Sequence, residues 1–213
     1  MAGHETRMLL LGAVALFEPV NGYQIRRELL SWQVEDWAHV NPGSIYSGLG
    51  TLTRQGHLVR HDLVDGSREV AVYEMTPSGR DELDRLLAQS LETVDLYDAV
   101  AFHAAFSMLT LVRRPDATRH LDVRLRSLEE TIEHLETVAR DHSDHAPPHA
   151  MQALRLQLEQ ARSQRTWLVE TLDDVRSGRL TFAGEPSEWM PAPDDPGWQM
   201  NADRERYLAL LHR

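Results

Sequence analysis

The stretch that decides the fold is Asn41-Pro-Gly-Ser-Ile-Tyr-Ser-Gly-Leu-Gly-Thr-Leu-Thr-Arg-Gln-Gly-His-Leu-Val59. Asn41 is a favoured N-cap, and Pro42 suits the first helical position because its missing N–H would have had no partner there. Gly56 is typical of a helix stop. Three apolar positions recur at helical spacing and should face a core: Ile45, Leu49 and Leu52. The stretch therefore predicts a capped helix that leads into a strand.

The polar side chains of this helix should lie on its outer face. They are short enough to let the backbone approach a duplex, and polar enough to bond phosphates and base edges. The set is Ser44, Tyr46, Ser47 and Thr51. We interpret the helix as one that reads DNA. For Tyr46, a packing role against the preceding helix remains the alternative.

Segments on both sides of this helix complete a winged helix-turn-helix pattern. Helical runs lie upstream, alternating strands lie downstream, and the Asp65-Gly66 turn between the strands predicts a hairpin. The segments are helices at 8–17 and 23–32, strands at 57–63 and 69–75, and a further helix opened by Thr76-Pro-Ser-Gly79. Three helices, a two-stranded wing and another helix make up the predicted domain.

Short motifs in this region resemble the PadR family of bacterial transcriptional regulators. The motifs are Leu10-Leu-Gly12, Asn21-Gly-Tyr-Gln-Ile25, Pro42-Gly-Ser-Ile-Tyr46, Leu52-Thr-Arg-Gln-Gly-His-Leu58 and Tyr73-Glu-Met-Thr-Pro-Ser-Gly-Arg80. The resemblance covers residues 7–90, and it implies a helical C-terminal dimerisation domain. The long second half is similar to the larger subfamily with several extra helices. Two departures from the family are a wing with few basic residues and two tryptophans in the stretch 31–40.

The second half of the chain repeats a coiled-coil spacing twice. Steps of four and three residues relate Leu121, Leu125, Leu128, Ile132 and Leu135, and then Leu154, Leu158, Ala161, Arg165, Leu168, Leu172 and Val175. The loop 142–149 contains two prolines, so the two helices should pair as an antiparallel hairpin. Each helix has more apolar surface than one partner can cover, and we expect a second copy of the chain to cover the rest. Arg165 would interrupt the seam as a register-setting polar residue.

Residues 94–112 predict a helix that is apolar on nearly all sides and therefore buried. Small residues beside aromatic ones can wall a ligand cavity, which two tryptophans near the reading helix would close. The candidate effector-binding residues are Trp32, Trp37, Tyr97, Phe102, His103 and Phe106. Ordinary core and dimer interface is the alternative. For His103 we favour a hydrogen-bonded core histidine over a ligand.

The formal charge of −11 is unevenly distributed along the chain. Residues 1–80 carry seven arginines against nine acidic residues, a net charge of −2, whereas residues 81–213 carry a net −9. A near-neutral domain can still bind DNA if its arginines cluster, and its affinity should then depend strongly on salt. The candidates for DNA contact are Arg26, Arg27, Arg54, Arg60 and Arg68. Solvation of the surface is the alternative for each of them.

Metal binding and membrane insertion have little support in the sequence. Cysteine is absent, which excludes disulfides, thiolate metal sites and cysteine catalysis. His142, His145 and His149 have the spacing of metal ligands but lie in a proline loop, so we expect an exposed loop without a metal. The apolar run 8–17 is too short for a bilayer, which needs about 20 residues. We expect a cytoplasmic protein without a membrane partner.

The segment 178–201 is rich in proline and glycine and contains Trp189 and Trp198. Tryptophans in an irregular segment usually anchor it to a folded body. We therefore expect it to pack against the helical domain or the partner subunit, with disorder as the alternative. A short helix at 204–212 should follow.

These patterns predict a mainly α protein with two domains. Residues 1–90 would form the winged helix-turn-helix domain with a two-stranded wing, and residues 91–213 the α-helical dimerisation and effector-binding domain. We expect a homodimeric, sequence-specific repressor that binds double-stranded DNA at an inverted-repeat operator and is relieved by a small hydrophobic or aromatic effector. The alternative is a metal- or metabolite-dependent sensor, or an enzyme, built on the helical half. No phosphate-binding loop, nucleophile motif or paired-carboxylate motif is present, so we expect neither catalysis nor a cofactor.

Overall fold

The computed structural model describes residues 3–38, 40–142, 145–186, 190–195 and 197–212. By its internal contacts the chain divides into two units. The reading unit comprises residues 1–87 and 186–213, and the helical unit comprises residues 88–185. None of the described helices is both long and apolar enough to cross a membrane.

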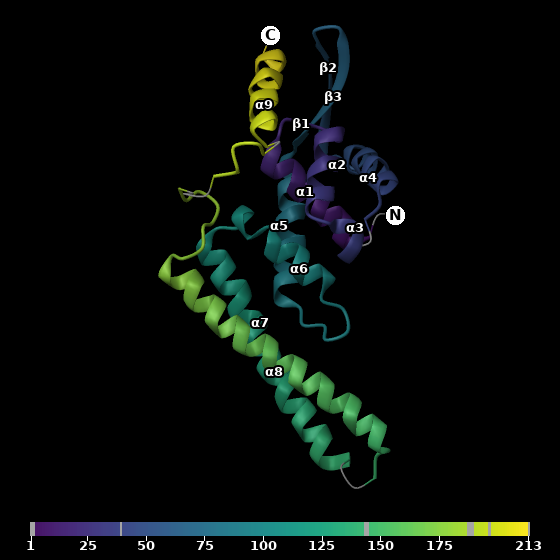
Figure 1. Ribbon diagram of the computed structural model, residues 1–213, viewed down its shortest axis with the longest axis vertical. Helices are drawn as coiled ribbons and strands as arrows, with labels where there is room; N and C mark the ends of the chain where they lie inside the picture. The colour runs from purple at the N-terminus through teal and green to yellow at the C-terminus, as the bar shows by residue number, and fades with distance from the viewer. Residues whose placement is uncertain (1–2, 39, 143–144, 187–189, 196, 213) are drawn as a thin grey trace. The chain divides into compact units, whose positions relative to one another are not determined.

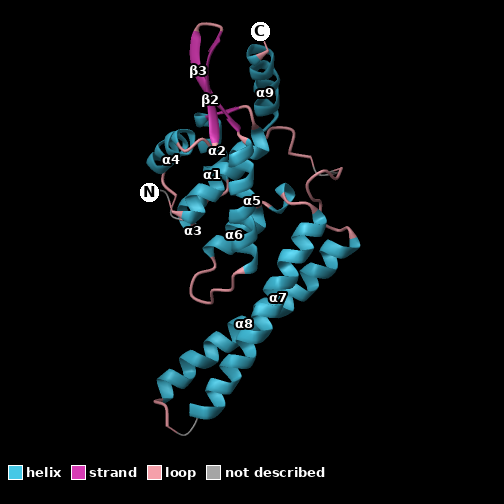
Figure 2. Cartoon of the chain, turned by 180° about the vertical axis from the view of Figure 1, so that it is seen from behind, coloured by secondary structure: helices cyan, strands magenta, loops and turns pink. Residues whose placement is uncertain are grey.

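The reading unit is a winged helix-turn-helix fold with an added C-terminal helix (Figures 1 and 2). Its elements are α1 (His4–Phe17), β1 (Val20–Asn21), α2 (Gly22–Ser31), α3 (Val34–Trp37), α4 (Pro42–Arg54), β2 (Leu58–Asp65), β3 (Arg68–Met75), the start of α5 (Pro77–Glu92), and α9 (Gly197–Leu211). The strands form an antiparallel sheet in the order β1-β3-β2. This arrangement confirms the fold class predicted from the sequence.

Local sequence explains where α2 and the wing turn lie. Asn21 Oδ1 accepts a hydrogen bond from the Gln24 backbone N at 2.9 Å, and Gln24 Oε1 accepts one from the Asn21 backbone N at 3.1 Å. Such a reciprocal capping box fixes the first turn of a helix. In the wing, Asp65 pairs with Arg68, and Gly66 takes a φ of +65° in the turn between them. Glycine adopts that conformation without strain, so the predicted hairpin is confirmed.

Two short elements of the reading unit were not predictable from the sequence. β1 has two residues and extends the wing sheet by pairing Val20 with Tyr73. α3 follows Gln33, whose φ of +57° separates it from α2. The Trp37 indole N–H donates to the Trp32 carbonyl at 2.9 Å and so braces the connection between α2 and α4. Elements of two to four residues are too short to show a periodicity.

The helical unit is dominated by α7 (Arg114–His142) and α8 (Pro148–Ser177), which pair as the predicted antiparallel hairpin (Figures 1 and 2). The ion pairs between the two helices run in opposite chain order: Asp122–Arg176, Glu129–Arg165 and Glu136–Arg162, at 2.6, 2.9 and 2.7 Å. Leucines at the predicted seam positions are buried: Leu121, Leu128, Leu168 and Leu172. Arg165 is exposed rather than placed inside the seam, because its long side chain reaches outward to Glu129.

The predicted helix at 94–112 is wrong in its extent. The structure contains a shorter helix, α6 (Val100–Ser107), followed by a single 3₁₀ turn, η1 (Leu109–Leu111). Asp95 Oδ1 accepts the backbone N–H groups of Tyr97 and Asp98, which forms a turn in place of a helix. The predicted burial also fails at Tyr97, whose exposed fraction is 84%, and at His103, which is exposed.

The C-terminal segment differs from the predicted domain division. Residues up to Glu185 pack on the helical unit, because Arg114 binds both Glu185 and the Leu180 carbonyl and lies over the Phe182 ring. Residues 186–213 instead group with the reading unit, whereas the sequence placed all of 91–213 in one domain. α9 also begins at Gly197, seven residues before the predicted start at Arg204. Trp189 lies outside the described residues, and Trp198 donates its indole N–H to the Ala192 carbonyl at 2.8 Å.

Candidate nucleic-acid interface

The start of α4 is fixed by the cap that the sequence predicts. Asn41 has extended backbone angles, and its Oδ1 accepts the Ser44 backbone N–H at 2.9 Å. Pro42 occupies the first helical turn, where it removes no intrahelical hydrogen bond. The helix N-terminus is therefore well ordered, which a helix that inserts into a DNA groove requires.

The inner face of α4 packs closely on α1. Ile45, Leu49 and Leu52 are buried, as predicted. A Cβ on Gly48 would lie 2.4 Å from Leu10 Cδ1 of α1, so any side chain at residue 48 would displace the Leu10 side chain. The reading helix is thus held by its buried side and leaves its other side free.

A charged cluster ties the far end of α4 to two other helices. Arg7 of α1 donates to Gln55 Oε1 at 2.6 Å, next to the end of α4, and to Glu82 Oε1 of α5 at 2.7 Å. Glu82 also accepts from Arg85, and this hydrogen bond, aided by Arg7, lowers the pKa of the Glu82 carboxyl to about 2. The carboxylate therefore stays ionised, and the cluster stays intact, throughout the neutral range.

The outer face of α4 presents hydroxyl groups whose protons are already engaged. Ser44, Ser47 and Thr51 donate to carbonyls of the same helix or its cap, at 2.7, 3.1 and 2.9 Å. Arg54 donates to Thr51 Oγ1 at 2.9 Å. A hydroxyl oxygen that donates to its own helix retains lone pairs that can accept a further hydrogen bond. The face therefore offers small groups that suit contact with base edges.

Tyr46 combines exposure with packing. Its exposed fraction is 49%, while its ring lies against the start of α2, where a Cβ on Gly22 would be only 3.0 Å from Tyr46 Cε1. The ring is therefore braced from one side and open on the other. Both interpretations from the sequence, surface contact and packing, describe part of its environment.

Replacing Tyr46 with alanine should weaken binding to the operator by roughly tenfold, the discrimination expected of one base-edge contact. Because half of the ring is exposed, the fold should survive, and circular dichroism would verify this. Fluorescence anisotropy with labelled operator DNA measures the loss. Tyr46→Phe keeps the ring and removes only the hydroxyl, so it separates hydrogen bonding from stacking. A folded Tyr46→Ala protein that binds like the parent would remove Tyr46 from the interface.

The five candidate arginines differ in their surroundings. Arg60 pairs with Asp62 at 2.7 Å, and Arg27 contacts Glu28 at 3.1 Å. Arg26 Nε is buried without a hydrogen-bond partner in the described part of the chain. Arg54 and Arg68 are exposed at the end of α4 and beside the wing turn. Arg68 is thus the arginine best placed to reach a phosphate near the wing.

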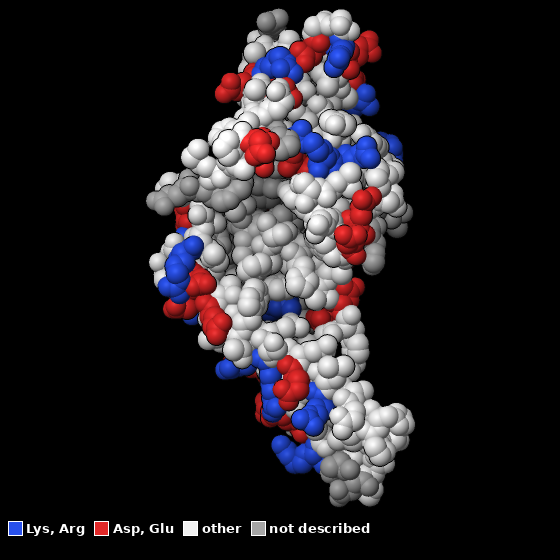
Figure 3. Space-filling model, in the orientation of Figure 1, with Lys and Arg blue, Asp and Glu red and all other residues white. Residues whose placement is uncertain are grey.

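The wing itself is acidic. Residues 58–75 contain two arginines against four acidic residues: Asp62, Asp65, Glu69 and Glu74. At the top of the face shown in Figure 3, acidic and basic groups are intermixed. General attraction to DNA is therefore weak for a single copy, in agreement with the charge count of residues 1–80.

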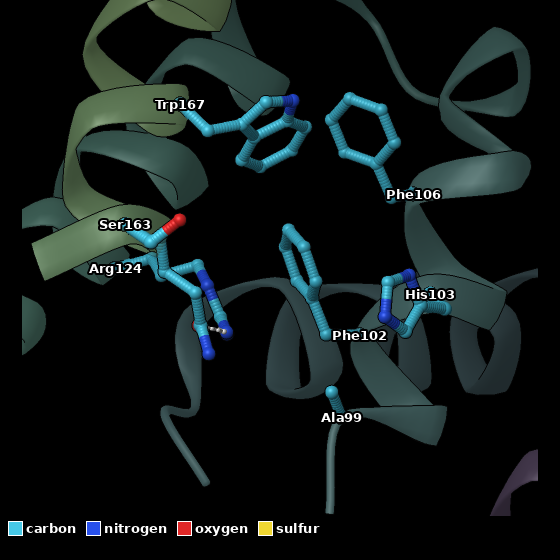
Figure 4. Close-up of a pocket in the computed structure, with 8 residues that line it drawn as sticks. Ala99, Phe102, His103, Phe106, Arg124, Ser163 and Trp167 are labelled. Carbon is cyan, nitrogen blue, oxygen red and sulfur yellow. Dashed lines mark hydrogen bonds between the residues drawn. The ribbon is translucent and has the colours of Figure 1, made fainter. Parts of the chain in front are cut away.

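The helical unit contains a pocket of about 370 Å³ (Figure 4). Three of the candidate effector residues line it: Phe102, His103 and Phe106 of α6. The Trp167 ring meets Phe106 and Phe102 edge to face, with centroids 5.0 and 5.9 Å apart. Trp32 and Trp37 belong to the reading unit, and Tyr97 lies in the exposed turn before α6, so none of these three is among the lining residues.

The lining residues that were missed in the sequence include Arg124 and Trp167. Arg124 of α7 has an exposed fraction of 1%, stacks 3.7 Å from the Phe102 ring centroid, and donates to the Thr93 carbonyl and Gln164 Oε1. Burial lowers the pKa of its guanidinium to about 10, so the group remains charged at neutral pH. Arg124 lies three residues after Leu121 and four before Leu128, which places it on the buried stripe of α7. This spacing could have predicted its burial from the sequence.

A capped helix with a polar outer face, held on a helix-turn-helix core and followed by a β-hairpin wing, defines a DNA-binding transcription regulator. Residues 10–85 match the model of the transcriptional regulator PadR-like family. The match lies within the reading unit, and the chain is similar to this family over those residues.

Three solved structures illustrate what the chain is similar to. Bacillus subtilis PadR in complex with operator DNA is 21% identical, with a TM-score of 0.33, covering 78% of this chain and 98% of that one. The PadR-like regulator BC1756 from Bacillus cereus is 16% identical, with a TM-score of 0.35, covering 82% and 97%. Bacillus subtilis PadR in complex with p-coumaric acid is 20% identical, with a TM-score of 0.31, covering 80% and 97%. These TM-scores are low, so the similarity to the family is carried by residues 10–85 alone. No curated protein matches the chain.

Proposed function

We propose that the protein is a homodimeric repressor of transcription that reads an inverted-repeat operator and is relieved by a small hydrophobic or aromatic effector. The observation that carries the proposal is α4, which is capped at Asn41, buried on one side and lined with exposed polar groups on the other. The DNA-contact residues proposed are those inferred from the sequence: Arg26, Arg27, Ser44, Tyr46, Ser47, Thr51, Arg54, Arg60 and Arg68.

Dimerisation is supported by charge and by exposed apolar groups. A single acidic wing gives little attraction to DNA, and engaging two half-sites at once raises the effective concentration of the second. On α8, Leu156 and Val169 have exposed fractions of 60% and 43%. These exposed side chains are available for contact with a second copy of the chain. A twofold pair of chains would bury them and present two reading helices to an inverted repeat.

The aromatic pocket of the helical unit supports the effector part of the proposal. Its size suits a small molecule, and its rings suit an apolar or aromatic one. No group of three or more histidine, cysteine or acidic residues in the described ranges could hold a metal ion. We assign sensing to the aromatic pocket.

Footprinting across the region upstream of the gene tests the proposal directly. The expected result is protection of two half-sites whose centres lie about 10 base pairs, or a multiple of that, apart. Repeating the experiment with indole, phenol and benzoate asks whether an aromatic compound releases the DNA. Uniform protection without a repeated element would contradict sequence-specific reading by a dimer.

Replacing Arg68 with alanine should weaken specific and non-specific binding alike and lower the salt slope by about one unit, since a phosphate contact carries no sequence information. The measurement is the affinity for operator and unrelated duplex over a range of salt concentrations. Arg155→Ala, the same change at an exposed position of α8, is the control and should leave both affinities unchanged. A loss confined to one operator base pair would instead make Arg68 a base-reading residue.

A further inference from the structure

α9 joins the reading unit from a distant part of the sequence. Figures 1 and 2 show it beside the β2–β3 wing and β1, and both its apolar anchors, Met200 and Tyr207, are buried. The fold that positions α4 therefore consists of elements from the first 92 residues together with α9, which begins at Gly197.

The first polar contact of α9 is with the capping box of α2. Asn21 Nδ2 donates to the Tyr207 hydroxyl at 2.9 Å, and Gln24 Nε2 donates to Asp203 Oδ2 at 2.8 Å. Gln24 is buried, so its amide N–H groups need partners inside the protein. Without α9, the two side chains that cap α2 would each lose a hydrogen bond.

The second polar contact is with the wing turn. Arg206 Nε lies 2.9 Å from Asp65 Oδ2, and Arg206 Nη2 lies 2.8 Å from Asp203 Oδ1. Asp65 is the last residue of β2, directly before the turn. A carboxylate at the tip of a wing repels nearby phosphates, because such charges interact over about 10 Å at moderate salt. Arg206 places a positive charge against this carboxylate.

We propose that α9 is a positioning element of the DNA-reading surface, in which Arg206 offsets the charge of Asp65 at the wing turn while Asp203 and Tyr207 hold the capping box of α2. This inference rests on the proposed DNA-binding function. It explains how a wing with more acidic than basic residues can lie close to DNA: part of the missing positive charge comes from another part of the chain. Arg206 acts through Asp65 and is not itself assigned a phosphate contact.

Four proteins test the proposal with the upstream operator fragment: the parent, Arg206→Ala, Asp65→Asn, and the double variant. Arg206→Ala should weaken binding by about three- to tenfold at low salt, since it leaves an uncompensated carboxylate at the turn. The double variant should recover parental affinity, because the repelling charge is gone. Asp65→Asn alone should bind at least as tightly as the parent. A purely structural role would lower the melting temperature of Arg206→Ala without recovery of DNA binding in the double variant.

Arg204→Ala is the matched control, because it removes the same charge from an exposed position of the same helix. Its affinity should stay within twofold of the parent. Equal losses for Arg204→Ala and Arg206→Ala would overturn the proposal in favour of a general charge effect. A salt slope lowered by about one unit in Arg206→Ala, without rescue in the double variant, would overturn it in favour of a direct phosphate contact.

If Arg206→Ala does not fold, the Asp65→Asn protein still tests the proposal. Weaker DNA binding by Asp65→Asn than by the parent would contradict the proposal that the Asp65 carboxylate repels DNA. Two failures remain distinguishable. If the parent binds neither the operator fragment nor an unrelated duplex, the proposed function is wrong and the role of α9 falls with it. If the parent binds and Arg206→Ala binds equally well, only the role of α9 is wrong.

Discussion

A glutamate in place of Leu128 is expected to unfold the α7–α8 hairpin. Leu128 and Leu168 are fully buried within a single chain, by the pairing of the two helices themselves. A carboxylate introduced there would be buried among leucines, which costs several kcal/mol. Circular dichroism and thermal melting should show loss of the helical unit, because this cost is a large part of the free energy of unfolding of a small unit. A Leu128→Glu protein with parental stability would mean that the seam is not packed as described.

Dimer formation has to be tested at other positions, because the seam leucines are buried inside each chain. Leu156 and Val169 are exposed on α8, so a glutamate there should leave the fold intact. If these residues form part of the dimer contact, Leu156→Glu and Val169→Glu should lower both the dimer fraction in sedimentation and the affinity for the operator. Folded monomers that still bind the full operator tightly would contradict the dimer mechanism.

Replacing Gly79 with alanine should destabilise the reading unit by about 3 kcal/mol or more, at or above the usual range for overpacking. A Cβ at this position would lie 2.0 Å from the His57 carbonyl oxygen, which is backbone and cannot rotate away. That carbonyl is itself fixed by the Thr76 backbone N–H at 3.1 Å, while Thr76 Oγ1 caps Gly79 at 2.9 Å. The start of α5 and the start of the wing thus meet with no room for a methyl group.

Chemical denaturation of the parent and Gly79→Ala proteins measures this loss. Gly50→Ala is the control, since a Cβ there meets only the flexible Arg54 guanidinium at 3.8 Å and alanine favours a helix interior. Gly50→Ala should therefore be neutral or slightly stabilising. Equal stability of the Gly79→Ala protein and the parent would show that α5 can move away from the wing without penalty.

The features that the sequence predicted well are those encoded by neighbouring residues. The cap at Asn41, the Asp65-Gly66 turn and the leucine spacing of α7 each depend on side chains within a few positions of one another. Local signals of this kind determine where an element begins, turns or buries a face. The cap, the turn and the leucine spacing could therefore be predicted without knowledge of the rest of the fold.

The features that it missed depend on competition or on distance. The Asp95 carboxylate competes for backbone N–H groups, and this delays the start of a helix that apolar composition alone would begin at residue 94. Arg124 lies on the buried stripe of α7, where the sequence pattern was judged by its leucines alone. Its hydrogen-bond partners, Thr93 and Gln164, are distant in the sequence. The docking of α9 joins residues about 180 positions apart, such as Gln24 and Asp203. No periodicity reports such a contact.

The docking of α9 also bears on how the protein is made. Synthesis proceeds from the N-terminus, and domains generally fold as they emerge. The wing and α4 are complete by residue 75, but Tyr207 and Asp203 follow only after the entire helical unit has been made. Until then the buried amide of Gln24 lacks its partner. A nascent or truncated chain that lacks α9 would therefore have an incomplete reading unit. By this argument the reading unit would be able to bind DNA only after the helical unit has been synthesised.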